Sequence, residues 1–154
     1  GLEYLNFMGD MYDVPARERA TQIEKYMRLF DIWHALRDPI RSYSRGMRQK
    51  LLITASRLHH PPLWLLDEPM VGLDPRAAHL LKEEMRSHRA AGGSVFFSTH
   101  VLEVAEQLCD RIGLIHQGRL IALGTLEELK NSEHQQTLEA VFLVMTKQGE
   151  DVFE

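Results

Sequence analysis

The chain opens with apolar residues that recur every three or four positions from Leu2 to about Ile32, which is the spacing of an amphipathic helix. The pattern breaks near Val14 and Pro15, and a proline inside a helical pattern ends the helix before it. The sequence therefore predicts two helices here. The apolar positions that define them are Leu5, Met8, Tyr12, Ile23, Met27, Leu29 and Phe30.

A third helix is predicted from Arg45 to about His59. Ser44 is a good N-cap because its hydroxyl can accept from a free backbone N–H of the first turn. Pro61 and Pro62 stop the helix, since proline cannot continue it. A turn around Asp38 and Pro39 connects this helix to the preceding pair.

The period then changes at Leu63–Leu66, a short apolar run without alternation. Such a run is typical of a strand buried on both faces, as in a parallel sheet. A second buried strand is predicted at Ser94–Ser98. Between them, Asp74 and Pro75 form a cap and first-turn pair that opens a helix to about Ala91, and Gly92 with Gly93 closes it.

Beyond His100 the pattern predicts a helix to about Leu108 and then a β-hairpin, with strands at Ile112–Ile115 and Leu120–Leu123 joined by a tight turn at Gln117–Gly118. Thr125 and Glu128 form a capping box for a short helix. An apolar helix is expected at Leu138–Met145. Strands alternating with helices indicate an α/β fold with a largely parallel sheet.

Composition restricts the function classes. The chain has 154 residues, 44% of them apolar, and a net charge of −4. This is typical of one soluble domain. Its basic residues are scattered, which does not favour nucleic acid as a partner. No run approaches the roughly 20 apolar residues of a membrane span. A single cysteine, Cys109, forms no internal disulfide, so a reducing, cytoplasmic location is expected.

Two acids, Asp67 and Glu68, end the first strand. A carboxylate beside a buried strand is costly without a partner, and ligands of open α/β sheets bind beyond the carboxyl ends of the strands. An acid there can meet a metal-bound phosphate, and the next one can orient or deprotonate a water. The structural alternative is a pair of turn and capping acids.

His100 follows the second strand and is predicted to lie at the same edge of the sheet. Imidazole can donate to a phosphate oxygen and accept from a water, so His100 is a candidate for the γ-phosphate or the attacking water. The other histidines lack such a position or metal-ligand spacing and are interpreted as surface residues: His34, His59, His60, His79, His88, His116 and His134.

Ser44, Arg45, Gly46 and Met47 open the third helix, where free N–H groups and the helix dipole attract anions. Ser44 adds a hydroxyl, Arg45 a positive charge, and Gly46 permits close approach to the backbone. A serine N-cap alone is common and equally fits a purely structural role.

The order of these segments is specific: Tyr-Ser-Arg-Gly-Met, a helix, Leu-Trp-Leu-Leu-Asp-Glu-Pro, Gly-Leu-Asp-Pro, a helix and Ser-Thr-His. Over essentially its whole length the chain resembles the nucleotide-binding domain of ABC transporters, from just after the glutamine loop to the C-terminus. The resemblance implies a P-loop NTPase-type parallel sheet, here incomplete, with a helical signature-motif subdomain and a C-terminal hairpin. The expected divisions are residues 1–60, 61–124 and 125–154.

The same resemblance implies a role for each motif. Ser44, Arg45, Gly46 and Met47 look like the signature motif, which binds the γ-phosphate of ATP held by the opposite subunit. Asp67 looks like the Walker B acid that serves Mg²⁺, Glu68 like the catalytic base and His100 like the switch histidine. Gly72, Leu73 and Asp74 resemble the D-loop, which communicates between the two sites.

Partners follow from the resemblance as well: a second nucleotide-binding subunit in a head-to-tail dimer, and a transmembrane permease at the inner face of the cell membrane. Tyr43, Arg45 and Met47 depart from the commonest Leu-Ser-Gly-Gly-Gln signature. Such variants look like those of exporter-type ATPases, and Leu138–Phe142 resembles the C-terminal helix of that subgroup.

One motif is missing: no Gly-x-x-x-x-Gly-Lys-[Ser/Thr] phosphate loop occurs in the sequence. We therefore expect a chain truncated at its N-terminus and inactive alone, whose complete form is an ATPase that powers export. The alternative is a non-catalytic fragment or a regulatory interaction protein. A soluble ABC ATPase acting on ribosomes or DNA is disfavoured by the single set of motifs.

Overall fold

The computed structural model of the chain describes residues 1–150 and divides into two compact units, residues 1–98 and residues from Thr99 onward. The first unit contains the elements α1 (Leu2–Met11), α2 (Ala16–Leu29), η1 (Trp33–Ala35), η2 (Ile40–Ser42), α3 (Arg45–Arg57), β1 (Leu63–Leu66), α4 (Pro75–Ala90) and β2 (Ser94–Phe97). The second contains α5 (Leu102–Leu108), β3 (Ile112–His116), β4 (Arg119–Gly124), α6 (Leu126–Ser132) and α7 (Leu138–Glu150). All predicted helices and strands are confirmed, each within a few residues of its predicted ends.

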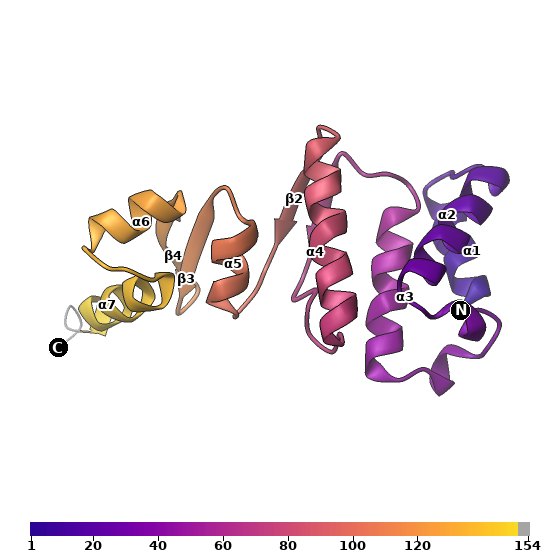
Figure 1. The fold of residues 1–154 in the computed structure, drawn as a ribbon, viewed down its shortest axis with the longest axis horizontal. Coiled ribbons are helices and arrows are strands. Elements are labelled where there is room, and N and C mark those ends of the chain that lie inside the picture. Colours follow the sequence, from indigo (N-terminus) through magenta and orange to yellow (C-terminus); the bar gives the residue numbers. More distant parts are fainter. Residues whose placement is uncertain (151–154) are drawn as a thin grey trace. The chain divides into compact units, whose positions relative to one another are not determined.

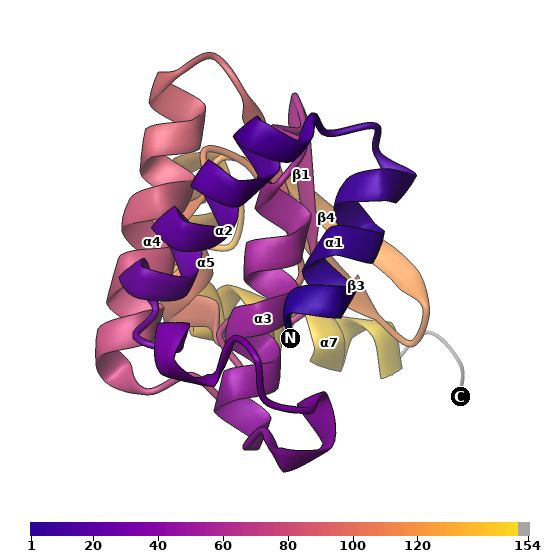
Figure 2. The ribbon, with the colours of Figure 1, turned by 90° about the vertical axis from the view of Figure 1, so that its right-hand side faces the viewer.

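In the first unit, α1 and α2 pack on α3, and α4 runs beside β2 (Figures 1 and 2). The break between α1 and α2 falls at Val14 and Pro15, as predicted, and the backbone of Pro15 caps α2. The core of this unit is formed by apolar side chains that are almost fully buried, among them Tyr26, Met27, Phe30, Leu51, Trp64 and Leu81.

Strands β1 and β2 pair in parallel, with Leu63 opposite Ser94 and Leu66 opposite Phe97. The expected burial of both faces is wrong. Trp64 is 1% exposed, whereas Leu65 is 63% exposed and Phe96 69%. Side chains alternate between the two faces of a strand, and among the described residues only the Trp64 face is covered.

The second unit is built around the predicted hairpin of β3 and β4, an antiparallel pair. Gln117 and Gly118 both have positive φ, at 47° and 74°, as a type I′ turn requires. The capping box of Thr125 and Glu128 is present at the start of α6. The core of this unit consists of Ala105, Ile112, Leu114, Leu129, Leu138 and Val141.

The α/β class is confirmed, with one parallel pair and one antiparallel pair of strands in the described chain. No helix of the described residues is both long and apolar enough to cross a bilayer. Cys109 is a free thiol, and burial raises its pKa above the usual range. The three-part division at residues 60 and 124 remains a prediction.

Candidate functional site

The ends of the two parallel strands meet through Ser98. Its hydroxyl donates to Asp67 Oδ1 at 2.5 Å and accepts from the backbone N–H of Glu68 at 2.9 Å. The register explains this contact, because Leu66 lies opposite Phe97 and each polar residue is the next along its strand. The serine fixes the Asp67 carboxylate and the Glu68 backbone relative to each other.

Glu68 adopts φ +43°, in the left-handed region that non-glycine residues seldom occupy. Its carbonyl accepts from Val71 N–H at 3.1 Å, which closes a tight turn directly after the strand. Conformations of this kind persist where the surroundings impose them and concentrate at functional sites. Here the N–H contact with Ser98 and the turn together hold the backbone of Glu68.

The predicted cap at the start of α3 is confirmed: Ser44 Oγ accepts from Met47 N–H at 3.2 Å. Tyr43 precedes it and is buried, with its hydroxyl donating to Ala35 O at 2.6 Å. This anchor fixes the chain just before the helix, while Ser44 and Arg45 are exposed. The arrangement presents a capped helix N-terminus to solvent, where the dipole favours an anion.

The first two turns of α3 lie against the segment that follows Glu68. Gln49 Nε2 donates to Pro69 O at 3.2 Å, and Lys50 Nζ donates to Asp74 Oδ2 at 2.8 Å. A Cβ on Gly46 would lie 2.7 Å from Gly72 O, so only glycine fits there. The residues predicted as signature motif and D-loop therefore touch within one chain.

Asp74 also caps α4, as predicted, and its Oδ1 accepts from Ala77 N–H at 2.9 Å. The hydrogen bond from Lys50 and the one from Ala77 hold the pKa of the Asp74 carboxyl below its usual range. Asp74 thus stays ionised at neutral pH and joins α3 to α4.

His100 belongs to the second unit, two residues after Ser98, and its side chain is exposed. Thr99 Oγ1 accepts from Val101 N–H at 3.1 Å, which turns the chain just before α5. Within the first unit the structure brings together Asp67, Glu68 and Ser98 in one group, and Gly46, Gly72 and Asp74 with Lys50 in another. Gln49 and Pro69 connect the two.

A magnesium ion fits the first group by donor chemistry. Mg²⁺ is held in nucleotide sites by one or two carboxylates or hydroxyls together with phosphates and waters. Asp67 supplies a carboxylate of this kind at an exposed edge, and the Ser98 hydroxyl donates to it. Among the described residues there is no group of three or more histidine, cysteine or carboxylate side chains, as a protein-only metal cage would need.

Sequence reasoning missed Lys50 and the role of Ser98, which was noted only as a strand end. It was also wrong about His88, interpreted as a surface residue, which is 9% exposed. His88 lies four residues after Glu84 on α4, where Leu81 and Met85 define the buried face. Helical spacing from these two places His88 close to that face, so the signal was present.

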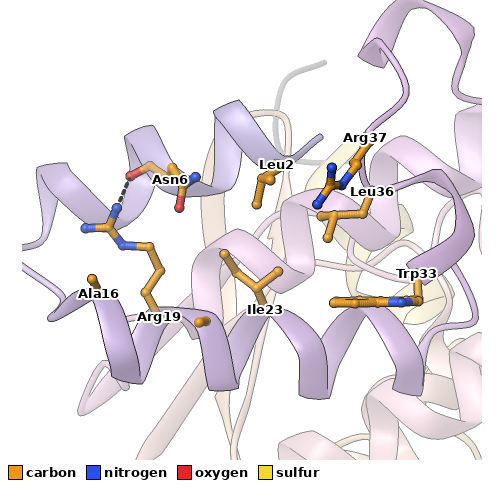
Figure 3. Close-up of a pocket in the computed structure, with 9 residues that line it drawn as sticks. Leu2, Asn6, Ala16, Arg19, Ile23, Trp33, Leu36 and Arg37 are labelled. Atoms are coloured by element: carbon orange, nitrogen blue, oxygen red, sulfur yellow. Dashed lines mark hydrogen bonds between the residues drawn. The ribbon is translucent and has the colours of Figure 1, made fainter.

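A hollow of about 270 Å³ lies between α1, α2 and η1, apart from all the predicted site residues. Figure 3 shows Trp33 and Ile23 at its side, with Arg19 reaching the backbone oxygen of Asn6, to which it donates at 3.1 Å. The Arg19 guanidinium also binds Asp10 and Val14 O, so it ties α1 to α2.

Comparison with known proteins gives the class. Residues 3–106 match the family model described as "AAA domain, putative AbiEii toxin, Type IV TA system". The chain is 37% identical to the linearmycin resistance ATP-binding protein LnrL of Bacillus subtilis over 82% of its length. It is 38% identical over 84% to the daunorubicin resistance ATP-binding protein DrrA3 of Streptomyces coeruleorubidus.

A solved structure titled "Structure of ATP binding subunit of ABC transporter" superposes with a TM-score of 0.88 at 33% identity, covering 94% of this chain. The chain therefore carries an AAA-type domain and belongs to the family of ABC-transporter ATP-binding proteins. It spans 41% of the length of both curated relatives and 61% of the solved chain.

Proposed function

We propose that the protein containing this chain is the ATP-hydrolysing subunit of an ABC transporter that powers export through a separate permease. The observation that carries the proposal is the bridge from Ser98 to Asp67 and the N–H of Glu68, which holds two acids at the carboxyl edge of a parallel pair. Phosphoryl transfer to water needs this combination, a metal-binding acid next to a group that orients the water.

In this proposal Asp67 would hold the metal, with its carboxylate oriented by Ser98, and Mg²⁺ would supply charge neutralisation of the phosphates. Glu68 acts as the base that accepts the proton of the attacking water, and His100 positions that water or the γ-phosphate. Ser44 to Met47 offer a hydroxyl, a cation and helix N–H groups to the γ-phosphate of a nucleotide on a second subunit. The tight fit of Gly46 on Gly72 supports joint movement of these residues with the D-loop.

Export is favoured by the names of two relatives, the linearmycin and daunorubicin resistance ATP-binding proteins. The permease partner follows from the family, whose members are ATP-binding proteins of transporters. A location at the cytoplasmic face of the membrane, bound to the permease, goes with this assignment.

The test uses the protein expressed from its own gene, as mixed dimers of wild-type and Ser44→Arg subunits. Because the signature motif is proposed to act on the opposite subunit, a dimer of one wild-type and one Ser44→Arg subunit should keep one working site. If Glu68→Gln is added to the Ser44→Arg subunit, it should damage that subunit's own site while Ser44→Arg damages the partner's site, so both sites should be lost. Phosphate release at saturating Mg-ATP distinguishes the arrangements. If placing both changes on one subunit or on opposite subunits gives the same rate, the trans assignment is wrong.

A further inference from the structure

The first unit contains a buried arginine. Arg57, the last residue of α3, is 7% exposed. Its Nε donates to the hydroxyl of Tyr26 at 3.2 Å, and its Nη1 lies 2.9 Å from Nδ1 of His88. Its guanidinium also lies 4.8 Å from the ring centroid of Trp64. A buried cation is costly unless hydrogen-bonded and paired, so these partners are essential to it.

The geometry fixes the protonation of His88. A guanidinium can only donate, so Nδ1 must accept, and the single proton of the neutral ring is on Nε2. A Cβ on Gly93 would lie 2.4 Å from Nε2, so the backbone encloses that side of the ring.

The charged groups around His88 would not stabilise a second proton on its ring. A carboxylate reaches this cluster through Tyr26: Glu84 of α4 accepts from the Tyr26 hydroxyl at 3.2 Å and lies 3.9 Å from Lys25 of α2. His60, which follows α3, is a further basic group near His88 and also disfavours a positive charge there. The Trp64 ring from β1, which lies edge-on to His88, carries no charge. A proton on Nδ1 would remove the acceptor of Arg57 and place two cations in contact away from water.

We propose that Arg57 and His88 form a proton-sensitive lock, which is closed while His88 is neutral and ties α2, α3, α4 and β1 together. Protonation of His88 opens it. Burial, and then the charge of Arg57, lower the pKa of His88 below its usual value, which agrees with the geometry. The cost of opening therefore appears as instability in mild acid.

The lock supports the strand that leads to the acids. Trp64 packs against both Arg57 and His88, and its Nε1 donates to Ser56 Oγ at 2.8 Å in the last turn of α3. Asp67 follows three residues later. Any effect of the lock on catalysis by Asp67 and Glu68 would rest on the proposed function. The lock itself does not, so the experiments below test it without measuring ATP turnover.

The direction with pH follows from linkage. His88 has a lower pKa folded than unfolded, so its contribution is fully present above the unfolded value of about 6.5 and is lost as pH falls through the folded value. One proton changes the unfolding constant by at most about tenfold per pH unit. His59, whose pKa burial also lowers, adds a similar dependence.

His88→Asn isolates the lock, because the asparagine Oδ1 can take the place of Nδ1 as acceptor and does not titrate. In the protein expressed from its own gene, unfolding by urea is measured from pH 7.5 to 5.0. As the pH is lowered, we expect the wild-type unfolding constant to rise more steeply than that of the variant. The difference in slope should be at most about tenfold per pH unit. His59 is common to both proteins, and its effect cancels. Equal slopes would overturn the proposal.

A second measurement needs no stable variant. Imidazole ¹⁵N shifts of the wild-type protein report tautomer and titration, and nuclear Overhauser contacts of the His88 ring with the Trp64 ring assign the signal. The lock requires the Nε2–H tautomer at pH 7.5 and a midpoint below 6.5. An Nδ1–H tautomer, or a midpoint at or above 6.5, would contradict it.

Discussion

The ammonium of Lys50 lies 2.8 Å from the carboxylate of Asp74 and joins the second turn of α3 to the cap of α4. The Lys50 side chain is largely buried, whereas that of Asp74 is half exposed, so solvent screens the pair in part. A charged hydrogen bond with one buried partner contributes more to stability than an exposed surface ion pair. We therefore expect Lys50→Met to destabilise the protein by about 1 kcal/mol. Urea unfolding at pH 7 measures this.

Arg86→Met is the matched control. Arg86 pairs with Glu83 at 2.6 Å within one helix, and both side chains are about half exposed. Its loss should change stability by no more than about 0.5 kcal/mol. Equal effects of the two substitutions would show that the Lys50 pair is an ordinary surface contact.

Gly46→Ala tests the contact between the start of α3 and the loop after Glu68. The new methyl group would lie 2.7 Å from the backbone oxygen of Gly72, and a backbone atom cannot yield as a side chain can. We expect a loss of about 1 to 3 kcal/mol in the free energy of unfolding. In Gly113→Ala the nearest atom is the tip of the Leu120 side chain at 3.1 Å, so that variant should lose less.

Ser98→Ala removes the hydroxyl shared by Asp67 and Glu68. Partners that orient metal-binding groups typically contribute about 10- to 100-fold in activity or metal affinity. We expect ATP turnover of the protein expressed from its own gene to fall by about that factor, with partial recovery at raised Mg²⁺. Ser98→Thr keeps the hydroxyl and should retain most activity. If both variants turn over ATP like the wild type, the bridge has no role in hydrolysis.

The helices and strands were predictable because each has a local signal: the serine and aspartate caps, Gly92 after α4, the Gln117–Gly118 turn and the Thr125 capping box. Burial was less predictable. The apolar run Leu63–Leu66 fits a strand buried on both faces, yet Leu65 is exposed. Whether a strand face is buried depends on which elements pack against it, and a local sequence pattern does not encode this.

Among the site residues, Ser44 and Asp74 were placed correctly as caps, because capping depends on neighbours three residues away. The contacts of Lys50, Gly72 and Ser98 join residues more than twenty positions apart. Only the parallel register and the packing of α3 bring them together. The buried pair of Arg57 and His88 was missed for the same reason, since its members lie 31 residues apart.

The proposed role of Glu68 as the base of an ATPase is tested by Glu68→Gln. Glutamine keeps the size of the side chain but cannot accept the proton of the attacking water. In the protein expressed from its own gene, we expect kcat for ATP to fall by about 10²- to 10⁴-fold while the nucleotide Kd stays within a few-fold. Wild-type kcat in Glu68→Gln, or an effect confined to KM, would contradict it.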